Sequence, residues 1–60
     1  MKREPLVRYV SPFGSPAWMT RAAAARYLAE DDRRWLNYQT AGNLSEQQRQ
    51  IGPPRIERQA

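Results

Sequence analysis

Hydrophobic and polar positions predict a short strand near the start of this chain and a helix in its middle. Residues 6–10, LVRYV, are rich in the β-branched and aromatic side chains that strands favour. Alternation along that strand places Val7 and Tyr9 on one face. The opposite face carries Leu6, Arg8 and Val10. Further on, Ala24, Tyr27 and Leu28 follow helical spacing and share one side of a helix.

Residues 11–18 lie between these two patterns and predict an irregular connection. Pro12, Gly14 and Pro16 interrupt any regular hydrogen-bonding pattern over this stretch. Its aromatic side chains are expected to cover the core. Trp18 in particular is expected to pack inside the protein, because so small a fold needs its largest apolar groups for stability.

The middle helix has a clear start signal. Thr20 is a favoured N-cap residue, and the four alanines at positions 22–25 have the highest intrinsic helix propensity. Gly42 follows the last residue of the pattern and is a typical stop signal.

Whether residues 20–39 form one helix or two is open on the pattern alone. Aspartate is a poor residue in a helix interior and a strong N-cap, so residues 29–32 favour a turn, with a second helix beginning near Asp31. The packed side of that second helix would consist of Trp35, Leu36 and Tyr38. A continuous helix also fits, since apolar and polar positions continue in a stripe through Leu28, Asp32, Trp35 and Gln39. We favour two helices.

The last part of the chain predicts a short helical turn and a second strand. The turn would be capped at Asn43 or Ser45 and carry Leu44 and Ile51 at its apolar ends. Two prolines then favour extended backbone, so residues 55–58 are expected to form a strand with Ile56 facing inward. Antiparallel pairing with residues 6–10 gives a mainly α fold with a small β component (α+β). Residues 1–60 would form one small domain with frayed ends.

Length and composition limit how such a fold can be stabilised. The chain has 60 residues and neither cysteine nor histidine, so disulfides and ordinary zinc sites cannot support its core. Stability must come from aromatic packing together with the aliphatic residues, namely Leu6, Val7, Val10, Leu28, Leu36, Leu44, Ile51 and Ile56. The apolar runs are shorter than the roughly 18 residues of a membrane span, and a signal-peptide core is not evident. A cytoplasmic location is therefore expected.

The charge balance favours an anionic partner. Ten Lys+Arg face six Asp+Glu, which gives a net charge of +4. Nine of the ten cations are arginine, whose planar fork donates two hydrogen bonds at once to phosphates or guanine edges.

Catalytic chemistry is not indicated. The sequence contains no histidine, which is the usual general base, and no cysteine, which is the usual thiol nucleophile. It also contains no Gly-rich phosphate loop. Asp31 and Asp32 are better explained as a helix cap than as metal ligands. We therefore expect neither enzyme activity nor a cofactor.

Three segments, MTRAAAARYL, DDRRWLNY and GPPRI, resemble the small winged helix-turn-helix proteins of the excisionase and MerR-like group. The resemblance covers residues 19–56. It implies a first helix capped by Thr20, a second helix capped by Asp31, and a wing entered through Gly52, Pro53 and Pro54. In that family the second helix enters the major groove and the wing contacts the DNA backbone or minor groove. The chain ends soon after Ile56, so any wing here is truncated or uses the N-terminal strand.

This resemblance implies a small DNA-binding regulator or excisionase-like architectural protein that acts on double-stranded DNA. Base readout is assigned to Arg33, Arg34 and Asn37, because Arg binds guanine and Asn binds adenine bidentately. Backbone or wing contacts are assigned to Arg21, Arg26, Arg55 and Arg58. A single module would bind weakly, so a homodimer, a cooperative multimer or a recombinase or host regulatory partner is expected. The alternative is a phage-type inhibitor or adaptor that binds protein through its Trp- and Arg-rich surface.

Overall fold

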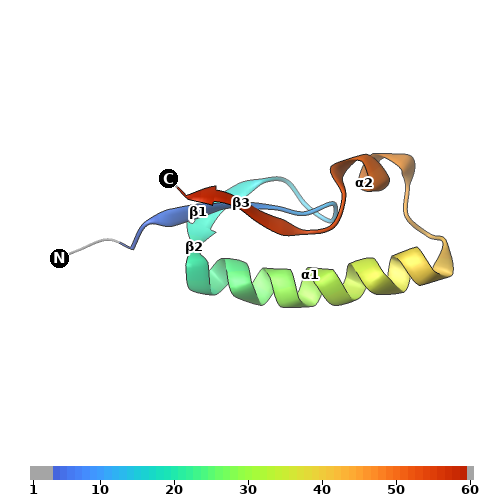
Figure 1. The fold of residues 1–60 in the computed structure, drawn as a ribbon, viewed down its shortest axis with the longest axis horizontal. Coiled ribbons are helices and arrows are strands. Elements are labelled where there is room, and N and C mark those ends of the chain that lie inside the picture. Colours follow the sequence, from blue (N-terminus) through green and yellow to red (C-terminus); the bar gives the residue numbers. More distant parts are fainter. Residues whose placement is uncertain (1–3, 60) are drawn as a thin grey trace.

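The computed structural model describes residues 4–59, which form a three-stranded antiparallel sheet with one long helix on one of its faces (Figure 1). In chain order the elements are β1 (Leu6–Val10), β2 (Ala17–Thr20), α1 (Arg21–Ala41), α2 (Glu46–Ile51) and β3 (Arg55–Gln59). The strand order is β2-β1-β3, so the strand from the start of the chain lies in the centre. The α+β fold and the antiparallel pairing of strands from the two ends of the chain are confirmed. The predicted fraying of the ends concerns residues 1–3 and 60, which lie outside the described part.

The predicted helix-turn-helix core is not confirmed, because α1 continues without a break from Arg21 to Ala41. Asp31 lies in the interior of this helix, with its carboxylate buried against the sheet. There it accepts a hydrogen bond of 2.6 Å from the Tyr9 hydroxyl. A partner on a different element thus replaces the backbone N–H that an aspartate at a cap would bind, and the turn expected at residues 29–32 does not form.

Both ends of α1 follow the local signals in the sequence. The Thr20 side chain accepts a hydrogen bond of 3.2 Å from the Ala23 backbone N–H. At the other end Gly42 adopts φ +70°, which is the left-handed conformation that glycine takes without strain. Ser45 caps α2 in a reciprocal arrangement with Gln48, which confirms one of the two predicted caps.

Residues 17–20 form a strand, so the prediction of an irregular connection was wrong for the end of that segment. Pairing with β1 explains the difference, since Met19 lies opposite Val7 and Trp18 lies opposite Arg8. The ladder satisfies backbone groups of Ala17–Thr20 that a loop would leave to water. Pro16 comes directly before the strand and does not interrupt the pairing.

The core lies between the sheet and the first half of α1. Val7, Tyr9 and Ala24 are buried, and Met19, Leu28 and Ile56 pack against them. Ala24 has no exposed surface, which lets the helix backbone approach the sheet closely. Among the aliphatic residues expected in the core, Leu6 and Leu36 are instead exposed, by 41% and 61%.

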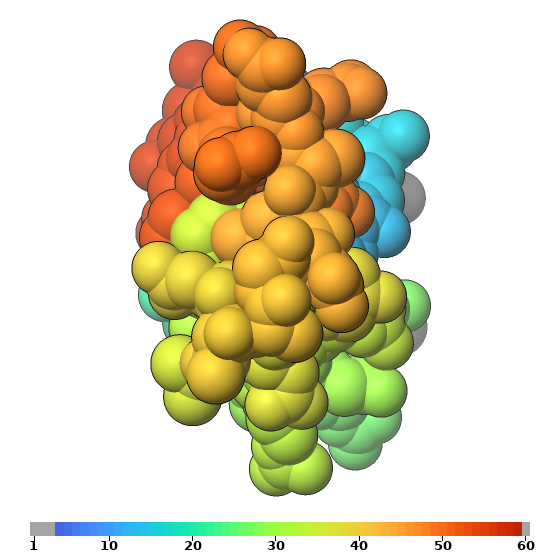
Figure 2. All heavy atoms as spheres, turned by 90° about the vertical axis from the view of Figure 1, so that its right-hand side faces the viewer, coloured from blue at the N-terminus to red at the C-terminus, as the bar shows by residue number. Residues whose placement is uncertain are grey.

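The C-terminal half of α1 extends past the strands (Figure 1). Figure 2 shows this end of the molecule, where the last turns of α1, the 42–45 connection and α2 lie together. The hairpin turn between β1 and β2 contributes Phe13, whose ring lies edge-on to Tyr38 with centroids 5.2 Å apart. Within residues 4–59, no helix combines the length and apolar character that a membrane span requires.

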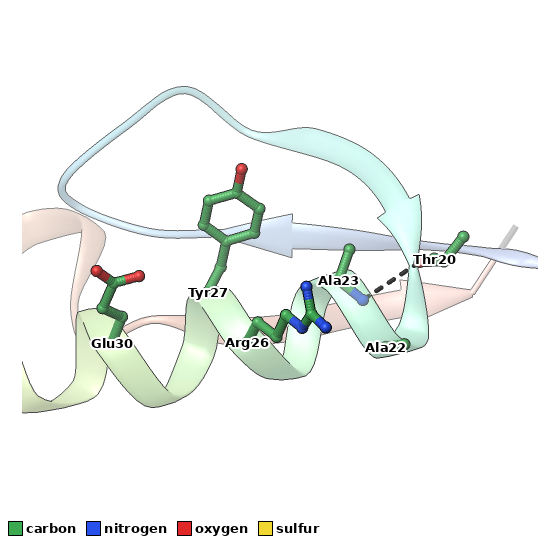
Figure 3. Close-up of a pocket in the computed structure, with 6 residues that line it drawn as sticks. All are labelled: Thr20, Ala22, Ala23, Arg26, Tyr27 and Glu30. Atoms are coloured by element: carbon green, nitrogen blue, oxygen red, sulfur yellow. Dashed lines mark hydrogen bonds between the residues drawn. The ribbon is translucent and has the colours of Figure 1, made fainter.

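One flank of α1 lies open beside β2 (Figure 3). A groove of about 570 Å³ runs along it, lined by Thr20, Ala22, Ala23, Arg26, Tyr27 and Glu30. A second groove of about 320 Å³ continues between α1 and the β1–β2 hairpin, and its walls include Phe13, Met19 and Arg34. Tyr27 borders both grooves.

Candidate nucleic-acid interface

The sheet face opposite α1 carries a row of three side chains across all three strands. Arg8 of β1 lies directly opposite Trp18 of β2 on one side and Arg58 of β3 on the other. Directly opposed residues in a sheet point to the same face. Because Val7, Tyr9 and Met19 face the core, this row faces away from it.

The indole ring of Trp18 contacts two cations. The guanidinium carbons of Arg8 and Arg58 are each 5.8 Å from the ring centroid. Such contacts contribute about 0.5–1 kcal/mol each at exposed sites. Trp18 nevertheless remains 41% exposed, so the expectation that it packs in the core was wrong. The row therefore combines positive charge with an accessible aromatic surface.

A bulge in β3 brings further charge to the same face. The pairing shifts between Arg8 and Tyr9, which lie opposite Arg58 and Ile56, so Glu57 is the extra residue on β3. Ile56 keeps its place against the core, while the residues on both sides of it can reach the open face. Without this extra residue, Arg58 would alternate to the core side of the sheet.

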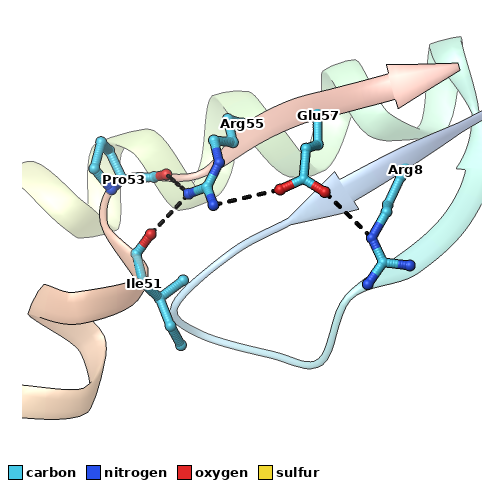
Figure 4. Close-up of polar contacts among 5 residues, drawn as sticks. All are labelled: Arg8, Ile51, Pro53, Arg55 and Glu57. Carbon is cyan, nitrogen blue, oxygen red and sulfur yellow. Dashed lines mark hydrogen bonds and ion pairs between the residues drawn. The ribbon is translucent and has the colours of Figure 1, made fainter.

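Glu57 links two arginines on this face, as Figure 4 shows. Its carboxylate lies 3.4 Å from Arg8 Nε and 3.6 Å from Arg55 NH2. Arg55 also donates hydrogen bonds to the carbonyl oxygens of Ile51, at 2.7 Å, and Pro53, at 3.4 Å. These pairs are half exposed, so they orient the guanidinium groups more than they stabilise the fold. Three arginines and one glutamate leave a net charge of two on the face.

The seven arginine and asparagine residues predicted to contact DNA are divided between different surfaces. Arg55 and Arg58 lie on the open sheet face with Arg8 and Trp18. Arg26, Arg33 and Asn37 are exposed on α1 and follow helical spacing on its outer side, away from the core residues Ala24 and Leu28. The outer side of α1 and the open sheet face therefore point in opposite directions.

The two remaining predicted residues make contacts within the protein. Arg34 lies 3.8 Å from the Asp31 carboxylate, and its guanidinium carbon is 5.5 Å from the centre of the Phe13 ring. Arg21 donates a hydrogen bond of 3.3 Å to the side-chain oxygen of Gln59. Arg34 thus faces the hairpin rather than the outer side of α1 where Arg33 stands.

The Tyr9 hydroxyl has a strongly altered acidity. Burial disfavours its ionised form, and the hydrogen bond to the Asp31 carboxylate acts in the same direction. Together they raise the pKa of Tyr9 far above its ordinary value of 10.0. Tyr9 therefore stays protonated and acts as a hydrogen-bond donor that holds α1 on the sheet.

Arg8 and Trp18 were not among the predicted site residues. Alternation in residues 6–10 places Arg8 away from Val7 and Tyr9, which was a usable signal for an outward-facing cation. Trp18 gave no such signal, because its segment was expected to be irregular. Residues 4–59 contain no group of three or more acidic, histidine or cysteine side chains placed to hold a metal ion.

Comparison with known proteins does not assign this chain to a family. No protein-family model, curated protein sequence or solved structure matches the chain.

Proposed function

We propose that this protein binds double-stranded DNA through the open face of its sheet. The observation that supports this most strongly is the row of Arg8, Trp18 and Arg58 across the three strands. Arginine forks suit both phosphate oxygens and guanine edges, and an exposed indole adds contact area against sugars and bases. The proposal assigns no catalytic step.

The dimensions of the sheet fit a DNA groove. Strand spacing of about 4.8 Å puts the outer strands roughly 10 Å apart. The major groove is about 12 Å wide and admits a two-stranded β-ribbon as well as a helix. In such a pose the three strands would lie across the groove, with Arg8 on the central strand.

Glu57 competes with DNA phosphates for the arginines of this surface. In the free protein its carboxylate partly neutralises Arg8 and Arg55. A phosphate oxygen would compete with that carboxylate for the same donors, so binding requires that these exposed pairs be exchanged. Exposed pairs of this kind contribute about 0–1 kcal/mol, which is small against several phosphate contacts.

The outer side of α1 is the competing DNA surface, and it is the one the resemblance to helix-turn-helix proteins implies. Its candidates for base readout remain Arg33 and Asn37, with Arg26 about two helical turns from Arg33. The outer side of α1 has a smaller charge surplus than the sheet face, because Glu30 lies about one helical turn from both Arg26 and Arg33. The charge balance favours the open sheet face.

A module of this size makes few phosphate contacts, so its DNA affinity alone would be low. Several copies on neighbouring sites, or a recombinase or regulatory partner in the cytoplasm, would complete the function.

Protein binding without DNA is the second candidate. Its support is the exposure of Leu36, which is 61% exposed on the C-terminal half of α1.

A fluorescence anisotropy titration with labelled duplexes at two salt concentrations tests the proposal. The Arg8→Ala/Arg58→Ala variant should bind more weakly, and the slope of log K against log salt should fall in magnitude by about 2. Arg33→Ala/Arg34→Ala is the matched control, since it removes the same charge from α1. Circular dichroism verifies that both variants are folded.

The control should keep most of its affinity and salt slope. Loss of binding in the helix variant with full binding in the sheet variant would reject the sheet face and return the site to α1. If the unaltered protein binds no duplex at low salt, the DNA proposal fails and the protein-binding candidate takes its place.

A further inference from the structure

The free edge of β2 differs from the other edge of the sheet. β2 has β1 as its neighbour on one side, and no described strand lies on the other. Its sequence, AWMT, contains no charged residue. The opposite edge is β3, RIERQ, whose charges discourage pairing with another strand. The edge of β2 lacks that protection.

The groove beneath this edge exposes an aromatic residue between opposite charges. Tyr27 is 52% exposed on the flank of α1 that lies beside β2. In Figure 3 its ring rises from α1 toward the β1–β2 hairpin, at a position along the helix between Arg26 and Glu30. Within residues 4–59 neither Arg26 nor Glu30 forms an ion pair, although they are one helical turn apart. Both charges are therefore available to a partner.

The order of these three residues is self-complementary. When two copies of α1 lie antiparallel around a two-fold axis near Tyr27, Arg26 of each copy faces Glu30 of the other. The same axis places two copies of β2 edge to edge in antiparallel direction. Two-fold symmetry is the commonest arrangement of oligomers, and it requires a surface that complements itself in this way.

From these features we infer that a second copy of this chain binds along β2 and the adjacent flank of α1. The two sheets join into one of six strands, and the Tyr27 rings fill the space between the two long helices. Two helices beneath β1 and its copy would be about 14 Å apart, at three strand spacings. Directly packed helices are about 8–10 Å apart, so the remaining gap suits side chains as long as tyrosine, arginine and glutamate.

The arrangement leaves the open sheet face uncovered. The two-fold axis is perpendicular to the joined sheet, so both rows of Arg8, Trp18 and Arg58 lie on the same side. Dimer formation does not depend on the proposed DNA binding. If both hold, the dimer presents two equivalent basic rows to one duplex.

Sedimentation velocity without DNA tests the inference separately from the proposed function. The unaltered protein should associate with rising concentration to twice the mass of one chain. Arg26→Glu and Glu30→Arg should each shift it to the monomer, because each places like charges in contact across the axis. An equimolar mixture of the two variants should regain the doubled mass, since opposite charges then meet at both contacts.

The double variant Arg26→Glu/Glu30→Arg should also associate, because opposite charges again meet across the axis. This result would show that the single variants dissociate through charge repulsion and not through loss of folding. A monomer at all concentrations would overturn the inference. Association that both single variants retain would also overturn it, because the dimer would then use another surface.

Discussion

At the scale of single residues, the contact between Tyr9 and Asp31 determines where α1 lies. The Tyr9 hydroxyl comes from the centre of the sheet, and the Asp31 carboxylate comes from the middle of the helix. A carboxylate is costly to bury without a donor, so this bond favours one register of the helix on the sheet.

Tyr9→Phe should lower the free energy of unfolding by about 1–3 kcal/mol, because the buried Asp31 carboxylate loses its donor. Urea denaturation followed by circular dichroism measures the change. Tyr27→Phe is the control, since no hydrogen bond to its hydroxyl is present among residues 4–59, and it should change stability little. Equal effects of the two substitutions would contradict the proposed role of the Tyr9 hydroxyl.

The same contact predicts a pH dependence. The pKa of Tyr9 is raised in the folded state, so its contribution to stability is complete below 10.0, the pKa of an unperturbed tyrosine. As the pH rises above that value, the unfolded chain releases the proton first, and stability should fall by up to about 1.4 kcal/mol per pH unit. The stability difference between the unaltered protein and Tyr9→Phe should narrow in that range. A difference that stays constant would show that the Tyr9 proton is not linked to folding.

Residue-level predictions from sequence succeeded where the partner is local. Thr20, Gly42 and Ser45 act within three or four residues of their own positions. Thr20 and Gly42 were predicted from the sequence, and Ser45 was one of two predicted caps. Asp31 was assigned to a cap because its actual partner is 22 residues away. Local propensity contains no information about such a partner.

At the scale of elements, tertiary contacts explain why α1 is one continuous helix rather than two. The side of α1 that faces the sheet consists of Ala24, Leu28, Asp31 and Trp35, all of which are at least partly buried. For a continuous helix, the sequence had predicted Asp32 rather than Asp31 on this side. β2 was missed for a related reason, since its pairing with β1 depends on a turn that Pro12, Gly14 and Pro16 make possible. Those residues signalled the turn but not the strand that follows it.

The left-handed conformation at the end of α1 predicts a position-specific effect of alanine. Gly42→Ala should destabilise the protein by about 1–2 kcal/mol, because φ is +70° there. Gly14→Ala is the matched control, since φ is not positive at Gly14 and an added Cβ meets nothing within 4 Å. It should be neutral or stabilise by up to about 1 kcal/mol. Thermal denaturation measures the stability of both variants. Equal losses of stability would contradict this account.

At the scale of the whole molecule, the protein is a thin sandwich of one sheet and one long helix, 47 × 18 × 13 Å in extent. Its core therefore depends on the close approach of α1 at Ala24. Ala24→Leu should lower stability by about 1–3 kcal/mol or more, because the added side chain has no space between helix and sheet. Ala25→Leu adds the same volume at an exposed position and should have little effect. Similar melting temperatures for the two variants would argue against this packing.

The candidate binding surface could be predicted only in part at this scale. Arginine was predicted to be the main binding residue type, and Arg55 and Arg58 were predicted to contact DNA. Their grouping with Arg8 depends on the antiparallel pairing of strands about 50 residues apart and on the bulge at Glu57. A sequence pattern gives the residue types available for binding, while strand register decides which of them share a face.

Chemical-shift mapping by NMR tests the central claim most directly, namely that the open sheet face binds duplex DNA. On addition of a duplex, the largest changes should occur at the Trp18 indole N–H and at the amides of Arg8 and Arg58. The outer side of α1 should change little. Changes concentrated at Arg33 and Asn37, with the Trp18 indole unaffected, would contradict the account.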